Sequence, residues 1–223
     1  MLPFTLHPVG DSALLAVFEQ RIAPEIGTAV AALNARVQAA AIPGVGETVP
    51  AFASLMITYD PLVTDYDTVA AALQKLAASP GAANTAETGR LVTIPVCYGG
   101  AFGPDLPFVA KHAGLTEQEV IALHAGRDYR IYMLGFLPGF PYLGGLDERL
   151  FTPRLPTPRT AIPAGAVGIG GEQTGIYPIA SPGGWQLIGR TPLKMFDPAA
   201  GKLPYAAGDR IRFTPITQAE FDA

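Results

Sequence analysis

Apolar positions in the first 80 residues follow the spacing of two amphipathic helices. They recur at steps of three and four over Ile22–Val37 and again over Tyr66–Leu76, which places them on one helical face. The Ile-Pro-Gly sequence that follows Ala41 predicts the end of the first helix there. Thr64 and Asp67 have the spacing of a capping box and predict the start of the second helix.

The other apolar runs of this segment predict strands. Phe4–Leu6 and Ala13–Phe18 flank the turn-forming pair Gly10–Asp11, which is typical of a β-hairpin. Phe52–Tyr59 forms a third run of this kind. The order strand, strand, helix, strand, helix predicts an antiparallel sheet that two helices cover on one face.

A small, polar stretch that begins at Ser79 separates this segment from the rest of the chain. It contains no large apolar residue and starts with a Pro-Gly pair, as linkers commonly do. We therefore predict a small α/β domain over residues 1–80, a linker over residues 81–90 and a second domain over residues 91–223.

The second domain is predicted to open with a strand over Leu91–Tyr98 and two short helices. The first of these helices is expected to end at Gly114. The second is expected to begin at Thr116, which is followed three residues later by a glutamate, and to end at Gly126. A further strand is predicted over Tyr129–Phe136.

Beyond Leu134 the chain is rich in both turn-forming and aromatic residues. The 82 residues from Leu134 to Pro215 contain 12 prolines and 14 glycines, a level often found in disordered segments. The same residues contain nine of the 20 aromatic side chains, which disordered segments lack. Short apolar runs cut by turns therefore predict a compact β-barrel or sandwich.

Composition and charge narrow the class of protein. With 49% hydrophobic and 15% charged residues and a net charge of −4, the chain has no basic stripe that would favour nucleic-acid binding. No apolar run reaches the roughly 18 to 20 residues of a membrane span. The first residues do not have the pattern of a signal peptide, and a single cysteine, Cys97, fits a reducing compartment. We therefore expect a cytoplasmic protein.

The sequence contains no standard catalytic signature. It has no G-x-x-x-x-G-K-[ST] phosphate loop and no G-x-S-x-G elbow. His7, His112 and His124 have no spacing typical of a metal site, so no metal is expected. The last two fall on predicted helices and are interpreted as structural or solvent-facing, while a functional role for His7 stays open. Catalytic residues are therefore unassigned.

Aromatic side chains in two loops are candidates for a cleft wall or a subunit interface. Phe140 and Tyr142 lie in a loop stiffened by Pro138 and Pro141, and a rigid loop loses little entropy on binding. Trp185, the single tryptophan, follows a Ser-Pro-Gly-Gly turn. The alternative remains open that these rings simply cover the core.

Polar residues in neighbouring loops are candidates for binding substrate or nucleotide. Arg159 offers a planar guanidinium suited to a carboxylate or a phosphate, although a surface salt bridge is an equally open interpretation. Gln173, Thr174 and Tyr177 follow a glycine-rich turn and are candidates for the polar lining of a site. A plain hairpin loop would have a similar sequence.

Several longer motifs give the chain a specific resemblance to one family. They are GDSALL from Gly10, IPVCYGG from Ile94, PGFPYLGG from Pro138, TPRT from Thr157, QTGIYP from Gln173 and SPGGWQLIGRT from Ser181. With these motifs the chain resembles the 5-oxoprolinase B subunits, a family also called allophanate hydrolase subunit 1 and, in another branch, kinase-A inhibitor.

The resemblance implies an α+β chain in which a ferredoxin-like α/β domain precedes a cyclophilin-like β-barrel. It also implies two partners, a cyclophilin-like C subunit and an A subunit, with which the chain opens 5-oxoproline to glutamate at the expense of ATP. The chain would then be one component of a hydrolase and inactive alone. Because it lacks a phosphate loop, we expect ATP to act at a site shared with the C subunit.

Two other functions stay open from the sequence. The chain would be a regulatory protein that inhibits a sensor histidine kinase, as in one branch of the family. Alternatively it would be a component of a urea or allophanate pathway, since a similar pair of domains occurs in urea carboxylase. The aromatic loop could dock either a C subunit or a kinase.

Overall fold

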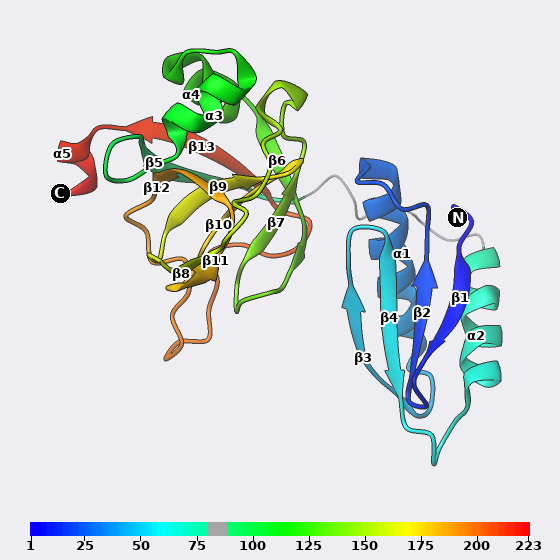
Figure 1. The fold of residues 1–223 in the computed structure, drawn as a ribbon. Coiled ribbons are helices and arrows are strands. Elements are labelled where there is room, and N and C mark those ends of the chain that lie inside the picture. The colour runs from blue at the N-terminus through cyan, green and yellow to red at the C-terminus, as the bar shows by residue number, and fades with distance from the viewer. Residues whose placement is uncertain (80–88) are drawn as a thin grey trace. The chain divides into compact units, whose positions relative to one another are not determined.

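A computed structural model describes residues 1–79 and 89–223, which form two compact units (Figure 1). One unit lies within residues 1–79 and the other spans residues 89–223. Most of the linker predicted over residues 81–90 lies outside the described residues. The α+β class and the β-barrel predicted from the sequence are both confirmed.

The first unit is a four-stranded antiparallel sheet with two helices. Its elements are β1 (Thr5–Val9), β2 (Ala13–Val17), α1 (Pro24–Ala40), β3 (Val45–Pro50), β4 (Ser54–Tyr59) and α2 (Tyr66–Ala78). The strands pair in the order β1-β2-β4-β3. Alternate residues of β4 are buried, and they form one core with the apolar faces of both helices, so the helices cover the same face of the sheet.

Two details of this unit differ from the sequence prediction. The edge strand β3 was missed because its sequence, VGETVP, has few large apolar side chains and is largely exposed. The predicted capping box of Thr64 and Asp67 is wrong. The helix begins one residue later, and the carboxylate of Asp65 accepts a hydrogen bond from the Thr68 amide at 2.8 Å.

The ferredoxin-like description of this unit stays a prediction. Its elements run β-β-α-β-β-α along the chain. A ferredoxin-like unit runs β-α-β-β-α-β. The extra strand therefore precedes the repeated pattern here instead of following it.

The second unit is a closed barrel of seven strands in the order β10-β7-β6-β13-β5-β12-β9. In chain order these are β5 (Leu91–Tyr98), β6 (Asp128–Leu134), β7 (Pro141–Gly144), β9 (Ala166–Gly170), β10 (Gln173–Ile176), β12 (Gln186–Arg190) and β13 (Arg210–Ile216). The β5–β13 pair is parallel and the other pairs are antiparallel.

Short elements cover the barrel. Helices α3 (Leu106–Ala113) and α4 (Glu117–Ala125) lie together at one end of it (Figure 1). A separate two-stranded sheet joins β8 (Arg159–Ile162) to β11 (Ser181–Gly183), and the remaining elements are the 3₁₀ helix η1 (Glu148–Leu150) and α5 (Gln218–Phe221). The predicted boundaries of the two helices are confirmed, because Gly114 ends α3 with a left-handed φ of 68° and Thr116 and Glu119 form a capping box.

A chain of hydrogen bonds with one direction crosses the barrel interior at His124. The Thr174 hydroxyl donates to the Gly168 carbonyl at 3.0 Å, so its oxygen accepts from His124 Nε2 at 2.8 Å. The other ring nitrogen, Nδ1, must then accept from the Tyr98 hydroxyl at 2.8 Å. His124 is therefore a neutral, structural histidine, which is one of the two roles that the sequence left open, and its full burial lowers its pKa to about 3.

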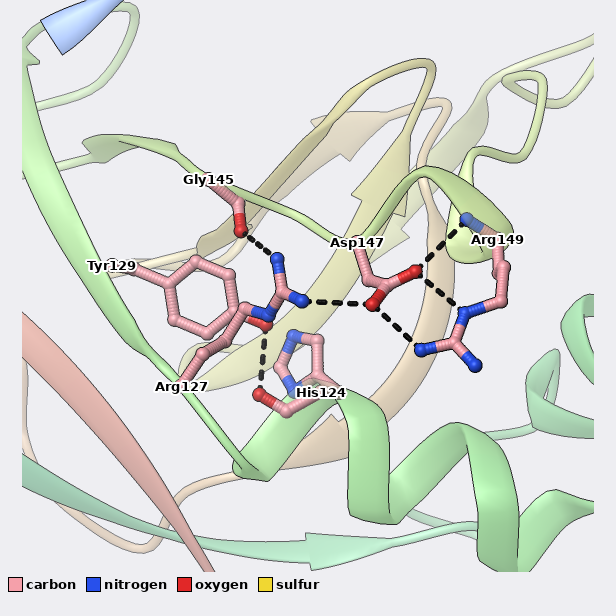
Figure 2. A network of polar contacts seen from close by, with 6 residues as sticks. All are labelled: His124, Arg127, Tyr129, Gly145, Asp147 and Arg149. Carbon is pink, nitrogen blue, oxygen red and sulfur yellow. Dashed lines mark hydrogen bonds and ion pairs between the residues drawn. The ribbon is translucent and has the colours of Figure 1, made fainter.

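Ion pairs hold the segment next to His124 in place (Figure 2). Arg127 follows α4 and donates to the Gly145 carbonyl and to the Asp147 carboxylate, both at 2.7 Å. Asp147 also accepts two side-chain hydrogen bonds from Arg149, and these bonds lower its pKa to about 2. The network thus ties the end of α4 to the segment after β7, and with it the position of the His124 ring.

We expect acid to destabilise the barrel through His124. Between its unfolded pKa near 6.5 and its folded pKa of about 3, the unfolded chain binds a proton that the folded chain does not. The free energy of unfolding should therefore fall by about 1.4 kcal/mol per pH unit below pH ~6. Urea unfolding followed by Trp185 fluorescence between pH 7 and 4 measures this slope.

His124→Gln should remove this part of the pH dependence, because glutamine cannot take up the proton. His112→Gln is the matched control, since His112 is an exposed helical histidine, and it should keep the wild-type slope. Equal slopes in wild type and His124→Gln would show that another group controls the acid sensitivity.

Candidate functional site

Five aromatic side chains form a cluster with Phe140 at its centre. The Phe140 ring makes edge-to-face contacts with Phe136, Tyr142, Tyr177 and Trp185, with centroid distances of 5.7, 5.1, 5.4 and 5.4 Å. Such contacts add roughly 0.5–1.5 kcal/mol each beyond burial. The candidates Phe140, Tyr142 and Trp185 therefore lie together, and the polar candidate Tyr177 joins them. Tyr142 lies in β7 and not in a loop as predicted, because Pro141–Gly144 pairs with β6 and β10.

The loop before β7 presents the outermost ring of this cluster. Two backbone hydrogen bonds close it, from Gly135 N to Phe140 O and from Phe140 N to Leu137 O. Phe136 has a left-handed φ of 61°, which is unusual for a bulky residue, and 65% of it is exposed. Backbone strain of this kind is concentrated at functional sites.

The cluster lies on the outer side of the barrel wall. Side chains of β9 and β10 alternate, so Val167, Ile169 and Ile176 belong to the barrel interior. Three of the outward positions on these strands are glycines: Gly168, Gly170 and Gly175. The aromatic cluster forms a separate hydrophobic core on this bare surface.

These glycines make room for the Trp185 indole. A Cβ atom at Gly170 would lie 2.5 Å from the indole, and one at Gly175 would lie 3.1 Å from it and 3.0 Å from Phe140. Contacts below 3.0 Å do not occur for real Cβ atoms, so the ring could not stay in place. The repeated Gly of the sequence VGIG is thus a seat for the tryptophan.

A cavity of about 90 Å³ opens among these rings. Besides the five aromatic residues, Arg154, Gly183 and Gly184 line it. The guanidinium carbon of Arg154 lies 5.8 Å from the centre of the Trp185 ring, which is a cation–π contact. Arg154 is the one charged residue that lines this cavity among the described residues.

The two tyrosines of the cavity are neutral near pH 7. Burial raises the pKa of Tyr142, and the charge of Arg154 acts against this rise. Burial also raises the pKa of Tyr177, against a backbone hydrogen bond with Trp185 and the charges of Arg154 and Arg159. Both phenols therefore face a positive charge without being ionised by it.

The candidate Arg159 lies next to the cluster and is already paired. One of its terminal nitrogens lies 2.7 Å from the Asp105 carboxylate and the other donates to the Trp185 carbonyl at 3.3 Å. Asp105 also accepts from the Leu187 amide at 2.6 Å. In this structure Arg159 holds the loop of Trp185 against α3 and β12.

The other two polar candidates do not line the cavity. Thr174 is fully buried in the barrel, where it bonds to His124 and Gly168, so no ligand in the cavity can reach it. Gln173 is half-buried at the start of β10. His7 is exposed and bonds to Thr5, and no group of three or more metal-ligating side chains occurs in residues 1–79 and 89–223.

Two residues of the site were missed from the sequence, Phe136 and Arg154. Arg154 lies in the same proline-rich stretch as Arg159, and nothing in their spacing separates a paired arginine from an unpaired one. The glycine pattern did carry a usable signal. Glycine at every second position of a strand predicts a bare face on which a large side chain can pack.

Comparison with known proteins gives a family. The model for the carboxyltransferase domain, subdomain C and D, matches residues 4–205. The chain is 41% identical to the 5-oxoprolinase B subunit of Bacillus subtilis, over 99% of this chain and 96% of that protein. It is 58% identical to the 5-oxoprolinase B subunit of Escherichia coli O157:H7, over 56% of this chain and 58% of that protein.

Solved structures of similar fold also exist. A conserved uncharacterized protein, PH0987 from Pyrococcus horikoshii, is 45% identical, with a TM-score of 0.58 over 97% of this chain and 100% of that chain. The Kluyveromyces lactis urea carboxylase is 21% identical, with a TM-score of 0.81 over 98% of this chain and 22% of that chain. The second likeness concerns the fold alone. No helix in the described part of the chain is long and apolar enough to cross a membrane.

Gly170→Ala should displace the tryptophan. The added methyl would overlap the indole and cost about 1–3 kcal/mol of unfolding free energy. Because Trp185 is the only tryptophan, its emission should shift to the red as the ring becomes exposed. Gly184→Ala is the control, since its Cβ would make only ordinary contacts at 3.6–3.7 Å, and it should leave the emission unchanged. Equal spectra for Gly170→Ala and wild type would contradict the proposed seat.

Arg159→Ala should lower stability because it leaves the carboxylate of Asp105 without its cation. We expect a loss of about 1–3 kcal/mol in urea unfolding. The loss should shrink when Asp105 is already asparagine, as a double-mutant cycle measures. Lys194→Ala removes an exposed ion pair and should stay within about 0.5 kcal/mol of wild type. A stable Arg159→Ala would restore Arg159 as a residue free to bind an anion.

Proposed function

Because the chain belongs to the carboxyltransferase C and D family and, within it, to the 5-oxoprolinase B subunits, we propose that it is the B subunit of an ATP-dependent 5-oxoprolinase. It would act with an A and a C subunit to open 5-oxo-L-proline to L-glutamate. The observation that carries the proposal is the 41% identity to a relative of this kind over nearly the full length of both chains.

The aromatic cavity supports a role in binding a small ring. Its volume of about 90 Å³ is well below the roughly 300–1,000 Å³ of sites for drug-sized ligands. Its walls are aromatic, and edge and face contacts of such rings suit a flat, compact substrate. A lactam ring has these properties, and closely packed apolar walls would keep water away from it until the amide is activated.

The residues of this cavity do not fit a nucleotide. It is small, Arg154 is its one cationic lining residue among those described, and the sequence has no phosphate loop. We therefore assign ATP to a site on another component of the complex or shared with one. ATP would activate the amide carbonyl there, and this chain would hold the ring.

Inactivity of the isolated chain follows from the same proposal. Its described residues contain neither a metal-ligating group nor a nucleophile paired with a base in the cavity. The site would then be completed at an interface, to which Phe136 and Arg154, both exposed residues of the cavity lining, would contribute. A role in urea metabolism has weaker support, since the relatives named for it are 27–33% identical over 7–11% of their length.

Co-expression tests the proposal. The chain, expressed with its candidate A and C subunits, should release glutamate from 5-oxoproline only when ATP is present. The matched control leaves out this chain and should be inactive. If the full set gave no glutamate while this chain alone suppressed autophosphorylation of a sensor histidine kinase, the proposed function would be wrong and the inhibitor alternative would replace it.

A further inference from the structure

The two arginines beside the aromatic cluster differ in what they can still bind. Arg159 is half-buried and forms an ion pair with Asp105 at 2.7 Å. Arg154 is exposed, and no carboxylate among the described residues pairs with it. Its guanidinium lies over the face of Trp185, and because the indole is neutral this contact does not cancel the positive charge. An anion that enters the cavity therefore meets Arg154 and not Arg159.

The lining of the cavity restricts what that anion can be attached to. Behind Arg154 the walls are the rings of Phe140, Tyr177 and Trp185, each at most 4% exposed. Gly183 and Gly184 complete the lining, and a Cβ atom at Gly183 would lie 2.6 Å from the Tyr177 hydroxyl, so this glycine lets Tyr177 pack against the backbone. No acidic side chain lines the cavity among the described residues. The lining therefore suits a ligand that carries one negative charge on a compact, mainly apolar ring.

We propose that Arg154 and the aromatic rings behind it bind a small ring carboxylate, with the guanidinium on the carboxylate and the ring against Trp185. A guanidinium presents a planar fork that matches the two oxygens of a carboxylate. This inference rests on the proposed function, because it assigns the carboxylate of 5-oxoproline to Arg154. It also limits the substrate to compounds in which the carboxylate is attached directly to the ring.

The position of Arg154 explains how selectivity would arise. Its side chain lines the cavity and lies over the indole, so a carboxylate bound there holds its ring within reach of the aromatic walls. A ring without a carboxylate would keep only the aromatic contacts. An open-chain product with a second carboxylate would bring an unpaired charge against the apolar walls, which is unfavourable. The site should therefore bind the open-chain product more weakly than the ring substrate.

Fluorescence of the full-length chain tests the site directly. Trp185 is the single tryptophan, so its emission reports on this cavity alone. We expect 5-oxoproline to change the emission saturably. Arg154→Met keeps the length of the side chain without its charge and should weaken this binding about ten- to hundredfold. Arg154→Lys should bind with intermediate affinity.

Two controls separate a binding role from a structural one. Binding of 2-pyrrolidinone, the same ring without the carboxylate, should be equal in wild type and Arg154→Met. Arg210→Met removes an arginine from β13 that does not line the cavity and should bind 5-oxoproline as wild type does. Each titration is measured from the variant's own baseline, because loss of the cation–π contact alters the starting emission.

The assembled enzyme gives an independent result. In an active complex, Arg154→Met should raise KM for 5-oxoproline about ten- to hundredfold with a much smaller effect on kcat. An active complex in which Arg154→Met leaves KM unchanged would overturn the inference while the proposed function stands. If no combination of subunits is active, the fluorescence titration decides alone. Arg154-dependent binding of a ring carboxylate would then support the site without the oxoprolinase function, and its absence would overturn both.

Discussion

Close contact between the Trp185 indole and a strip of bare backbone is the constraint on which the candidate site depends. Three outward positions of β9 and β10 are glycines, and a Cβ atom at Gly170 would come within 2.5 Å of the indole. With the indole in this seat, Phe140 packs against it at 5.4 Å and Tyr177 lies 6.3 Å away. The cavity exists because those rings meet edge to face and leave a gap between them. The barrel supplies this surface while its interior holds a separate hydrophobic core that includes Val167, Ile169 and Ile176.

The parts of the fold that the sequence predicted well depend on local physical rules. Helix α3 ends at Gly114, α4 begins at the capping box of Thr116 and Glu119, and the strand Leu91–Tyr98 matches its apolar run. The strand β3 was not predicted because an exposed edge strand needs no apolar face. The helix start was misplaced by one residue because Thr64 and Asp65 can both cap a helix, and in the structure the cap is Asp65. For β3 the missing information lies in its pairing with β4.

The candidate site was predicted in part, for a related reason. The aromatic candidates Phe140, Tyr142 and Trp185 do pack together, as large apolar rings from nearby segments commonly do, while their role stays a prediction. For the polar residues, the sequence did not indicate which of them face the cavity. Arg154 and Arg159 are alike in sequence, but the second meets Asp105, which is 54 residues away in the chain. Thr174 resembled a loop residue suited to a ligand, and its hydroxyl belongs instead to the interior hydrogen bonds of His124.

Those interior bonds have a consequence for how the protein can change by substitution. From Tyr98 through His124 and Thr174 to the Gly168 carbonyl, each group donates to the next, so the chain has a fixed donor-to-acceptor polarity. A replacement that reverses one link leaves two donors or two acceptors facing each other further along. Tyr98, His124 and Thr174 therefore have to be substituted together, because a change at one of them is tolerated only with a matching change at its neighbour. This series of hydrogen bonds ends at the carbonyl of Gly168, which lies beneath Trp185. Helix α4, which carries His124 and does not line the cavity, is therefore subject to the same constraints as the site.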